Sequence, residues 1–205
     1  MDPLLPDLKG KTILDLACGT GRWLERLFQR GAARGFGADL SMEMLRVASA
    51  NSKLSGKLMR AQGAEIPVHD GIVDLTVCSF GLGYMPNVSS LARDLARISR
   101  PGADVFISDF HPESYKRGWK RTFRHQDRVI EIATLAHEIE AIGDAFHNAG
   151  FTLKNRVEAM FGEPERKLFT QAGKGEMFDS AREWPAIYVL HFQLPAPSGN
   201  SANSK

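Results

Sequence analysis

Two glycines follow a short apolar run near the start of the chain, and a carboxylate ends the next apolar run. Residues 12–17 (TILDLA) are typical of a buried strand, and Gly19 and Gly21 come directly after it. Because glycine has no Cβ and readily adopts positive φ, such a turn lets the backbone approach a ligand closely. Asp39 lies 18 residues after Gly21, where a carboxylate can accept hydrogen bonds from two ribose hydroxyls. The pattern predicts a nucleoside-binding site.

These residues alone leave the kind of nucleoside open. The dinucleotide fingerprint needs a third glycine three residues after the second, and Leu24 occupies that position. This substitution disfavours an NAD-dependent oxidoreductase without excluding it. Asp15, which precedes the turn, is not explained by a dinucleotide. Its carboxylate would either face a positive charge on a ligand, such as an amino group, or bond the backbone of the turn.

Short apolar runs alternate with longer amphipathic segments through the first half of the chain. Ser41 is a good helix N-cap, and Pro101 and Gly102 end another helix. Strands that alternate with helices indicate a parallel sheet with helices on both faces and right-handed crossovers. The predicted strands are 12–17, 34–39, 58–59, 73–79 and 103–110, and the predicted helices are 22–30, the segment after Ser41, and 88–99.

The second half of the chain has a different rhythm. Residues 122–132 predict a small hairpin that turns near Gln126 and Asp127, and a helix is expected over residues 136–148. A polar, glycine-containing excursion separates the last two strands. These strands are expected at 151–160 and 186–194, with the excursion at 162–183.

Five motifs occur in the order and at the spacing found in one large enzyme family. They are LDLACGTG at 14–21, GADLS at 37–41, GAEIP at 63–67, DGIVDLTVCSFGL at 70–82 and RPG at 100–102. Over residues 11–110 the chain therefore resembles the class I S-adenosylmethionine-dependent methyltransferases, especially the type that acts in ubiquinone and menaquinone biosynthesis. The resemblance implies a Rossmann-like α/β fold, with a seven-stranded, mostly parallel sheet, helices on both faces and an antiparallel strand near the C-terminal edge.

The resemblance also implies a cofactor, S-adenosyl-L-methionine, and methyl transfer to an oxygen, nitrogen or carbon of a small organic acceptor. Asp15 and the glycines of the turn correspond to the region that holds the methionine part of the cofactor. Asp39 corresponds to the acidic residue that holds the ribose, and Ala64 and Glu65 to the loop beside the adenine. The full expected set is Asp15, Ala17, Cys18, Gly19, Gly21, Asp39, Leu40, Ser41, Ala64, Glu65, Ser79 and Phe80.

The acceptor side departs from the family pattern. Many relatives have a histidine where this chain reads LGYM at 82–85, and many have a longer N-terminal segment that covers the site. The lid is therefore absent, truncated or supplied by another part of the chain. We interpret segment 111–125, which starts at the carboxyl edge of the sheet, as the acceptor-side wall or lid.

Segment 111–125 combines aromatic side chains with clustered positive charge. Its cations would either attract an anionic or phenolate acceptor or form a solvated face, and Tyr115 and Trp119 would stack on a ring. The cations are Lys116, Arg117, Lys120, Arg121 and Arg124.

Three side chains are candidates for a catalytic base. His111 is the first, because an imidazole titrates near neutral pH, and Tyr84 and His125 follow. Each has a structural alternative, as a surface or hydrogen-bonded histidine or as a core aromatic residue. A dedicated base is not required, because a sulfonium is already an activated methyl donor.

Composition restricts the classes of function. The 205 residues are 43% hydrophobic and carry a formal charge of +2 from 26 basic and 24 acidic residues, which disfavours a nucleic-acid partner. Two cysteines and six histidines lack metal-ligand spacing, so no metal is expected. We find no secretory signal and no apolar run of the roughly 20 residues that a membrane span needs. A small-molecule acceptor and a cytoplasmic monomer or homodimer are expected.

We expect one methyltransferase domain over residues 1–195, with a cofactor half at 11–110 and acceptor-side elements at 111–185. A disordered tail is expected at 196–205. Two alternatives to a methyltransferase stay open. One is the NAD-dependent oxidoreductase, and the other is a non-catalytic protein that keeps the fold and the cofactor pocket.

Overall fold

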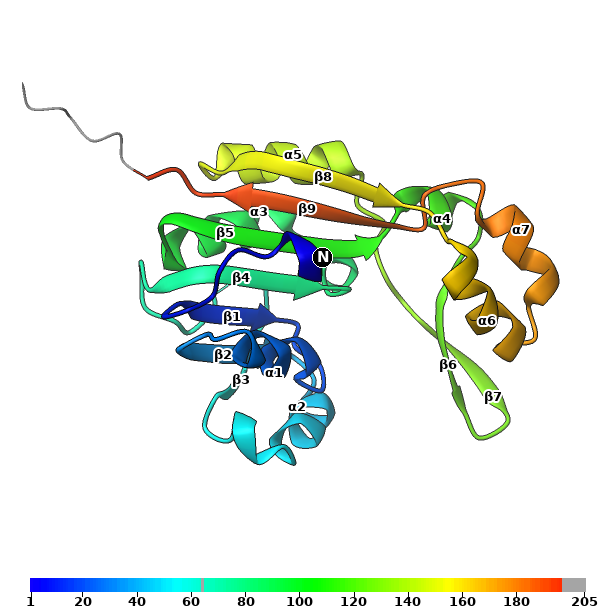
Figure 1. Ribbon diagram of the computed structural model, residues 1–205, viewed down its shortest axis with the longest axis horizontal. Helices are drawn as coiled ribbons and strands as arrows, with labels where there is room; N and C mark the ends of the chain where they lie inside the picture. Colours follow the sequence, from blue (N-terminus) through cyan, green and yellow to red (C-terminus); the bar gives the residue numbers. More distant parts are fainter. Residues whose placement is uncertain (64, 197–205) are drawn as a thin grey trace, which may run out of the picture.

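One mixed sheet forms the centre of the protein (Figure 1). The computed structural model describes residues 1–63 and 65–196, so Ala64 and all of the predicted tail except residue 196 lie outside the described residues. The strand order is β3-β2-β1-β4-β5-β9-β8. The strands are β1 (Thr12–Leu16), β2 (Arg34–Asp39), β3 (Leu58–Arg60), β4 (Val73–Ser79), β5 (Ser99–Phe110), β8 (Thr152–Ala159) and β9 (Ile187–Gln193).

The predicted mostly parallel sheet with an antiparallel strand near its C-terminal edge is confirmed. The pairs among β1 to β5 are parallel, and β9 is antiparallel to both β5 and β8. Because the parallel strands run in register, for example with Leu16 opposite Ala38 and Cys78, their carboxyl ends meet at one edge. Open α/β sheets bind ligands at that edge.

Helices cover both faces of the sheet because successive strand residues point in opposite directions. On β1, Ile13 belongs to a buried cluster with Leu24 and Leu27 of the first helix. Its neighbour Leu14 belongs to a second cluster, with residues of α3 and α5. The main helices are α1 (Arg22–Gln29), α2 (Met42–Ser49), α3 (Val88–Ile98) and α5 (Ile139–Asn148), and 3-10 turns lie at Asp2–Leu4, Ser52–Leu54, Leu82–Tyr84 and Gly175–Met177.

A hairpin projects from the body between β5 and α5 (Figure 1). It consists of β6 (Arg121–His125) and β7 (Arg128–Ile132), which pair antiparallel, so the predicted hairpin at 122–132 is confirmed. Gln126 has a φ of 52°, which supplies the left-handed residue of the tight turn. The excursion between the last strands contains two helices, α6 (Glu163–Gln171) and α7 (Phe178–Ala181), which lie beside the hairpin. A short helix, α4 (Pro112–Lys116), follows β5.

Helix α5 begins three residues later than its amphipathic pattern predicts. The predicted start is Ala136, and the observed start is Ile139. The preceding segment instead runs along the turn after β4. Leu135 N–H donates to the Gly83 carbonyl at 2.8 Å, and the His137 ring nitrogen Nε2 lies 3.0 Å from the Met85 carbonyl oxygen. These long-range bonds replace the first turn of the expected helix.

Two absences hold for residues 1–63 and 65–196. None of their helices is both long and apolar enough to cross a membrane. No group of three or more His, Cys, Asp or Glu side chains within the same ranges is placed to hold a metal ion.

Asp15 connects the first strand to the first helix. The side chain is buried, and its Oδ2 accepts the N–H of Leu24, in the first turn of α1, at 2.9 Å. Gly21, the N-cap residue, has no side chain to do this, so the carboxylate from the strand satisfies a helix N–H in its place. Burial raises the pKa of Asp15 to about 7; the Leu24 N–H opposes this shift, and the nearby Asp39 carboxylate adds to it.

Replacing Asp15 by Asn is expected to change how stability depends on pH. The folded protein holds a proton on Asp15 that the unfolded chain releases above its ordinary pKa of 3.8. The stability that this carboxyl contributes is therefore complete below pH 4 and is lost as the pH rises toward 7. Asn cannot titrate, so the free energy of unfolding of Asp15→Asn should rise relative to wild type by about 2 to 3 kcal/mol between pH 5 and 8.

Urea unfolding of both proteins at pH 5, 6, 7 and 8 measures this difference. The Asn amide oxygen can still accept the Leu24 N–H, so the comparison isolates the proton. A difference in unfolding free energy that is the same at all four pH values would show that Asp15 is ionised in the fold.

Candidate functional site

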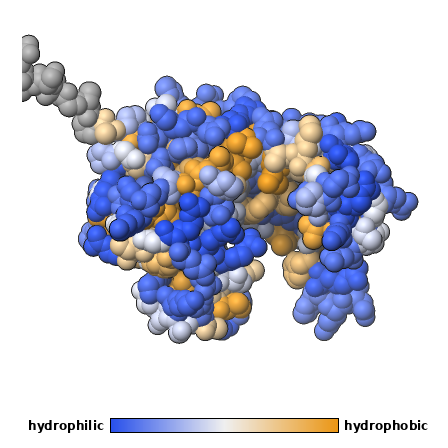
Figure 2. Space-filling view, in the orientation of Figure 1, coloured by the Kyte–Doolittle hydropathy of each residue, from blue (hydrophilic) through white to orange (hydrophobic). Residues whose placement is uncertain are grey.

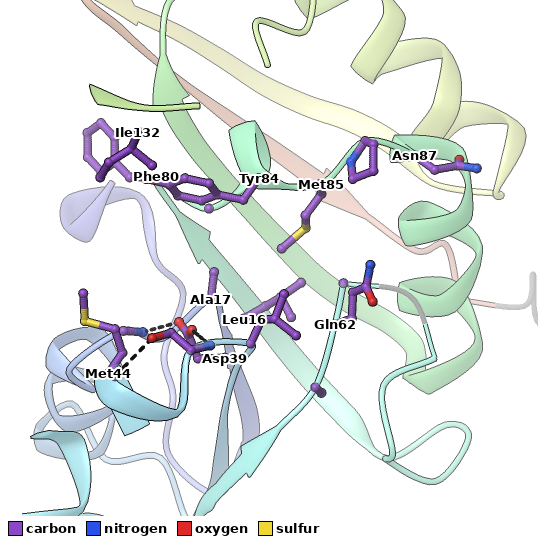
Figure 3. A pocket seen from close by; sticks show the side chains of 17 residues that line it. Leu16, Ala17, Asp39, Met44, Gln62, Phe80, Tyr84, Met85, Asn87 and Ile132 are labelled. Atoms are coloured by element: carbon purple, nitrogen blue, oxygen red, sulfur yellow. Dashed lines mark hydrogen bonds between the residues drawn. The ribbon is translucent and has the colours of Figure 1, made fainter. Parts of the chain in front are cut away.

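A cleft of about 590 Å³ lies at the carboxyl ends of β1, β2 and β4 (Figure 3). Its size is that of a small-molecule site, and most of the side chains around it are apolar. The lining residues are Leu16, Ala17, Gly19, Asp39, Leu40, Ser41, Met44, Ala61, Gln62, Gly63, Phe80, Gly81, Tyr84, Met85, Pro86, Asn87 and Ile132.

Asp39 is held in place by two backbone donors. Its Oδ2 accepts the N–H of Gly19 and its Oδ1 accepts the N–H of Ser41, each at 2.8 Å. One bond per oxygen leaves further acceptor capacity on both oxygens, which face a cleft that the residue lines. A carboxylate so fixed can accept two hydroxyl groups from a ribose without losing its position.

The turn after β1 leaves the space beside Asp39 open. Gly19 has a φ of +53°, and a Cβ built on it would meet no atom within 4 Å. Ala17 also takes a left-handed φ, of 56°, which is uncommon for a residue with a Cβ and turns the chain sharply at the strand end. The bare backbone and the fixed carboxylate therefore border the same volume.

The turn after β4 packs directly on the turn after β1. A Cβ on Gly81 would lie only 2.4 Å from the Ala17 Cβ, so the close approach requires glycine. Phe80, just before it, has a φ of 56° and lines the cleft. The two strand ends thus form one continuous wall.

Residues 61–63 and 65–68 follow β3, and the first three of them form the side of the cleft next to that strand. Arg97 of α3 donates to the carbonyls of Ile66 and Val68, and Asp94 accepts the Ile66 N–H at 2.6 Å. These bonds fix the loop that carries Gln62 and Gly63 into the cleft. Figure 3 shows the Gln62 amide on this side.

The opposite side of the cleft is aromatic and apolar. Phe80, Tyr84 and Ile132 lie together, across the cleft from Asp39 (Figure 3). Ile132 is the last residue of β7, so the hairpin contributes to the wall although it is far from β4 in the sequence.

A buried ion pair lies behind the aromatic side. Arg121, the first residue of β6, pairs with Asp109 near the end of β5 and donates to the Phe80 carbonyl at 2.6 Å. Its guanidinium lies 5.0 Å from the ring centres of Tyr84 and Phe110. Asp109 also accepts the Gly83 N–H at 3.0 Å. The pair therefore joins the hairpin, β5 and the turn after β4.

The other cations of segment 111–125 are not placed to create a positive surface at the cleft. Three of them are paired with carboxylates, and the fourth, Arg124, is exposed on the hairpin face opposite to that of Ile132. Lys116 pairs with Glu138, Arg117 with Glu113 and Lys120 with Glu131, at 2.8 to 3.0 Å between charged atoms. The expected stacking residues pack within the protein, because Trp119 stacks on Phe161 and Tyr115 meets the edge of Phe110. The expected attraction of an anionic acceptor by this segment is not supported.

Of the eleven expected cofactor residues that the structure describes, six line the cleft and five do not. Asp15 lies behind the turn as a cap for α1. Gly21 is needed for packing, since a Cβ there would lie 2.4 Å from Leu54 Cδ1. Cys18 is buried, and its thiol pKa is raised to about 12 by burial, so it is no nucleophile. The lining residues are Ala17, Gly19, Asp39, Leu40, Ser41 and Phe80.

The remaining two described residues of that set, Ser79 and Glu65, also lie outside the lining. The Ser79 hydroxyl is 3.1 Å from that of Ser108, between neighbouring strands. Glu65 is exposed and has a φ of 66°. The twelfth residue, Ala64, is outside the described residues.

One of the three candidate catalytic residues is at the cleft. Tyr84 lines it, with 48% of its surface exposed. His111 does not: its Nδ1 accepts the Glu113 N–H as the cap of α4, and its Nε2 lies 3.1 Å from the Glu158 carboxylate. His125 is exposed next to the hairpin turn and away from the lining. The structure therefore places neither histidine among the residues that line the cleft.

Sequence reasoning missed several lining residues. Gln62, Met44 and Met85 carry no motif of their own, and Asn87 is recognisable only as the N-cap of α3, where it accepts the Ser90 N–H. Ile132 was expected in the hairpin, but no local pattern indicates that it reaches the cleft. These positions become visible only when distant segments are brought together.

Comparisons with known proteins agree with this geometry. Residues 13–102 match the family model described as "Methyltransferase domain". The chain is 34% identical over 143 residues to an uncharacterized protein of Haemophilus influenzae, covering 63% of this chain and 55% of that one. It is 30% identical over 128 residues to the demethylmenaquinone methyltransferase of Lactococcus lactis, covering 58% and 51%. The chain thus spans about half the length of these curated relatives.

Solved structures share the whole fold. An S-adenosylmethionine-dependent methyltransferase from Mesorhizobium loti superposes with a TM-score of 0.72 at 20% identity, covering 94% of each chain. A geranyl diphosphate methyltransferase in complex with S-adenosylmethionine gives a TM-score of 0.68 at 13% identity, covering 93% of this chain and 81% of that one. At these identities the likeness concerns the fold alone.

The family model accounts for the segment that forms the glycine turn, Asp39 and the strand ends around the cleft. The strand order adds the antiparallel β9 between β5 and β8. Residues 13–102 are therefore similar to the methyltransferase domain family, and the fold is the one found in solved S-adenosylmethionine-dependent methyltransferases.

Proposed function

We propose that this protein binds S-adenosyl-L-methionine in the cleft and transfers its methyl group to a small organic acceptor. The observation that carries the proposal is the Asp39 carboxylate, fixed by Gly19 and Ser41 and open to the cleft on both oxygens. A nucleoside with two ribose hydroxyls is the ligand that this arrangement suits. The adjoining bare turn at Gly19 leaves room for the group attached to the ribose.

The residues around the cleft divide the work of binding. Asp39 would hold the ribose, the backbone at Ala17 and Gly19 the amino-acid part, and the loop at Gln62 and Gly63 the base. When bound, the cofactor supplies an activated methyl group on a sulfonium. The task of the chain is then to keep water out and to align the acceptor, for which the apolar side with Phe80 is suited.

An NAD-dependent oxidoreductase fits the turn less well. Leu24 stands where the third glycine of the dinucleotide fingerprint belongs, and it is fully buried. Its Cδ2 would lie 3.0 Å from a Cβ on Gly37 of β2, so this leucine fills the space between helix and strand. The helix therefore packs on the strand through a leucine, and not at the close distance that the third glycine of the fingerprint allows.

We propose that no histidine acts as base and that Tyr84 is the side chain of this chain best placed to meet the acceptor. It is the candidate that lines the cleft, and the Arg121 guanidinium stands against its ring. Orientation of the acceptor by Phe80 and Tyr84 is sufficient for transfer from an activated donor.

The first test is transfer itself. The protein is incubated with cofactor carrying an isotopic label on the methyl group and with a small-metabolite extract, and label is followed into extract components. Labelled product supports the enzyme. Binding of S-adenosylhomocysteine without any transfer would favour a non-catalytic protein, and a thermal shift with NADH but none with S-adenosylhomocysteine would favour the oxidoreductase.

Replacing Asp39 by Asn is expected to weaken binding of S-adenosylhomocysteine by about 10- to 100-fold, as the loss of a charged hydrogen-bond acceptor suggests. Isothermal titration calorimetry measures the affinity. The control is Glu43→Gln, which removes an equal charge from the neighbouring helix, where the carboxylate is exposed and binds Arg46. If both variants bind like wild type, Asp39 does not hold the ribose.

Single substitutions of Tyr84 and His111 should separate the roles of these two catalytic candidates. Tyr84→Leu is expected to lower the rate of label transfer by about tenfold or more through poorer alignment of the acceptor. His111→Asn keeps a cap acceptor for α4 and should stay within about twofold of wild type, whereas loss of a true base costs ~10²- to 10⁴-fold. Rates are compared in the same extract at saturating cofactor. A collapse of the rate in His111→Asn with unchanged melting temperature would restore the histidine as base.

A further inference from the structure

The β6–β7 hairpin presents a defined face to the cleft. In an antiparallel pair, directly opposed residues lie on the same face. Arg121 is opposite Ile132 and Phe123 is opposite Ile130, and these two pairs, two positions apart, share one face. Ile132 lines the cleft. The Phe123–Ile130 pair therefore continues the cleft wall outward along the hairpin.

This outer pair is apolar and uncovered. Phe123 is 47% exposed and Ile130 is 38% exposed. Across the opening, Leu40 and Met44 line the cleft and are also about half exposed. Figure 2 shows hydrophobic surface on both sides of the hollow between the α2 region and the hairpin. Apolar side chains thus border the cleft mouth from two elements that do not bury each other.

The position of this face is set by polar contacts at the root of the hairpin. The buried pair of Arg121 and Asp109 attaches β6 to β5, and Arg121 also holds the Phe80 carbonyl. Lys120 and Glu131 join the two sides of the hairpin at 2.8 Å. The hairpin face is therefore presented to the cleft in one orientation. Arg121 and Lys120 at its root are compensated, and the next pair outward on the same face, His125 opposite Arg128, is polar.

We infer that the Phe123–Ile130 face is a second acceptor subsite, which binds a hydrocarbon substituent of the acceptor. The inference rests on the proposed function, because the reacting group of the same molecule would lie between Phe80 and Tyr84. Continuity with the cleft favours a single ligand that spans both parts. The exposed apolar side chains of Phe123 and Ile130, with the paired cations Lys120 and Arg121 at the hairpin root, favour a hydrocarbon over an anionic group at this point.

A homologous series of para-alkylphenols, from phenol to octylphenol, tests the subsite. Affinity is measured by calorimetry on the full chain, with and without saturating S-adenosylhomocysteine. A methylene fully removed from water contributes about fourfold in affinity, and a half-open groove about twofold. We expect affinity to rise about twofold per methylene and then to level off once the alkyl chain passes Phe123 and Ile130 and reaches the polar pair of His125 and Arg128.

Two variants locate the effect. The double variant Phe123→Ser with Ile130→Ser should flatten the dependence of affinity on chain length. The matched control is Val129→Ser, which removes an even more exposed apolar residue, 64% exposed, from the opposite face of the same strand. It should leave the dependence unchanged. Met44→Ser changes a residue on α2, outside the hairpin. This variant should reduce the dependence of affinity on chain length even if the hairpin variant is misfolded.

A flat dependence in wild type, or an equal slope in the double variant and wild type, overturns the subsite. It is also overturned if analytical ultracentrifugation shows a dimer that the double variant dissociates, because a second copy then covers the face. Failure of the proposed function is recognised separately, because S-adenosylhomocysteine then does not bind to wild type. The dependence of alkylphenol affinity on chain length is still measured without S-adenosylhomocysteine.

Discussion

The bonds that fix the Asp39 carboxylate determine how the site is built. They tie the end of β2 to the turn after β1 and to the start of α2, so three elements share one polar group. Each carboxylate oxygen accepts one backbone N–H, and these donors do not depend on side-chain identity at Gly19 or Ser41. The nucleoside-binding geometry is therefore set by backbone turns and one carboxylate, and side chains around it have freedom to vary.

The acceptor side depends on a different interaction, the buried pair of Arg121 and Asp109. Asp109 is 3% exposed, and an uncompensated carboxylate there would cost about 3 to 5 kcal/mol. The chain therefore cannot release the hairpin without a penalty, although few apolar contacts hold it. In this way a two-stranded element, which is marginally stable by itself, keeps a fixed place beside the cleft.

The cofactor half could be predicted from the sequence because its signals are local. The strand Arg34–Asp39 has its predicted bounds, and the glycine turn and its acid lie within 21 residues of each other. The acceptor half could not be predicted in this way, because it depends on contacts between distant positions. For example, Arg121 donates to the carbonyl of Phe80, 41 positions earlier in the chain. His111 shows the same limit: its residue type suited a base, but the Glu113 N–H and the Glu158 carboxylate occupy its nitrogens.

The two halves meet at Phe80, whose left-handed backbone places its ring in the cleft while its carbonyl accepts from Arg121. A shift of the hairpin would move this carbonyl and, through Gly81, press on Ala17 of the cofactor turn, because no Cβ-sized gap separates the two turns. The root of the hairpin and the turn after β1 are therefore joined through the tight contact of two strand ends.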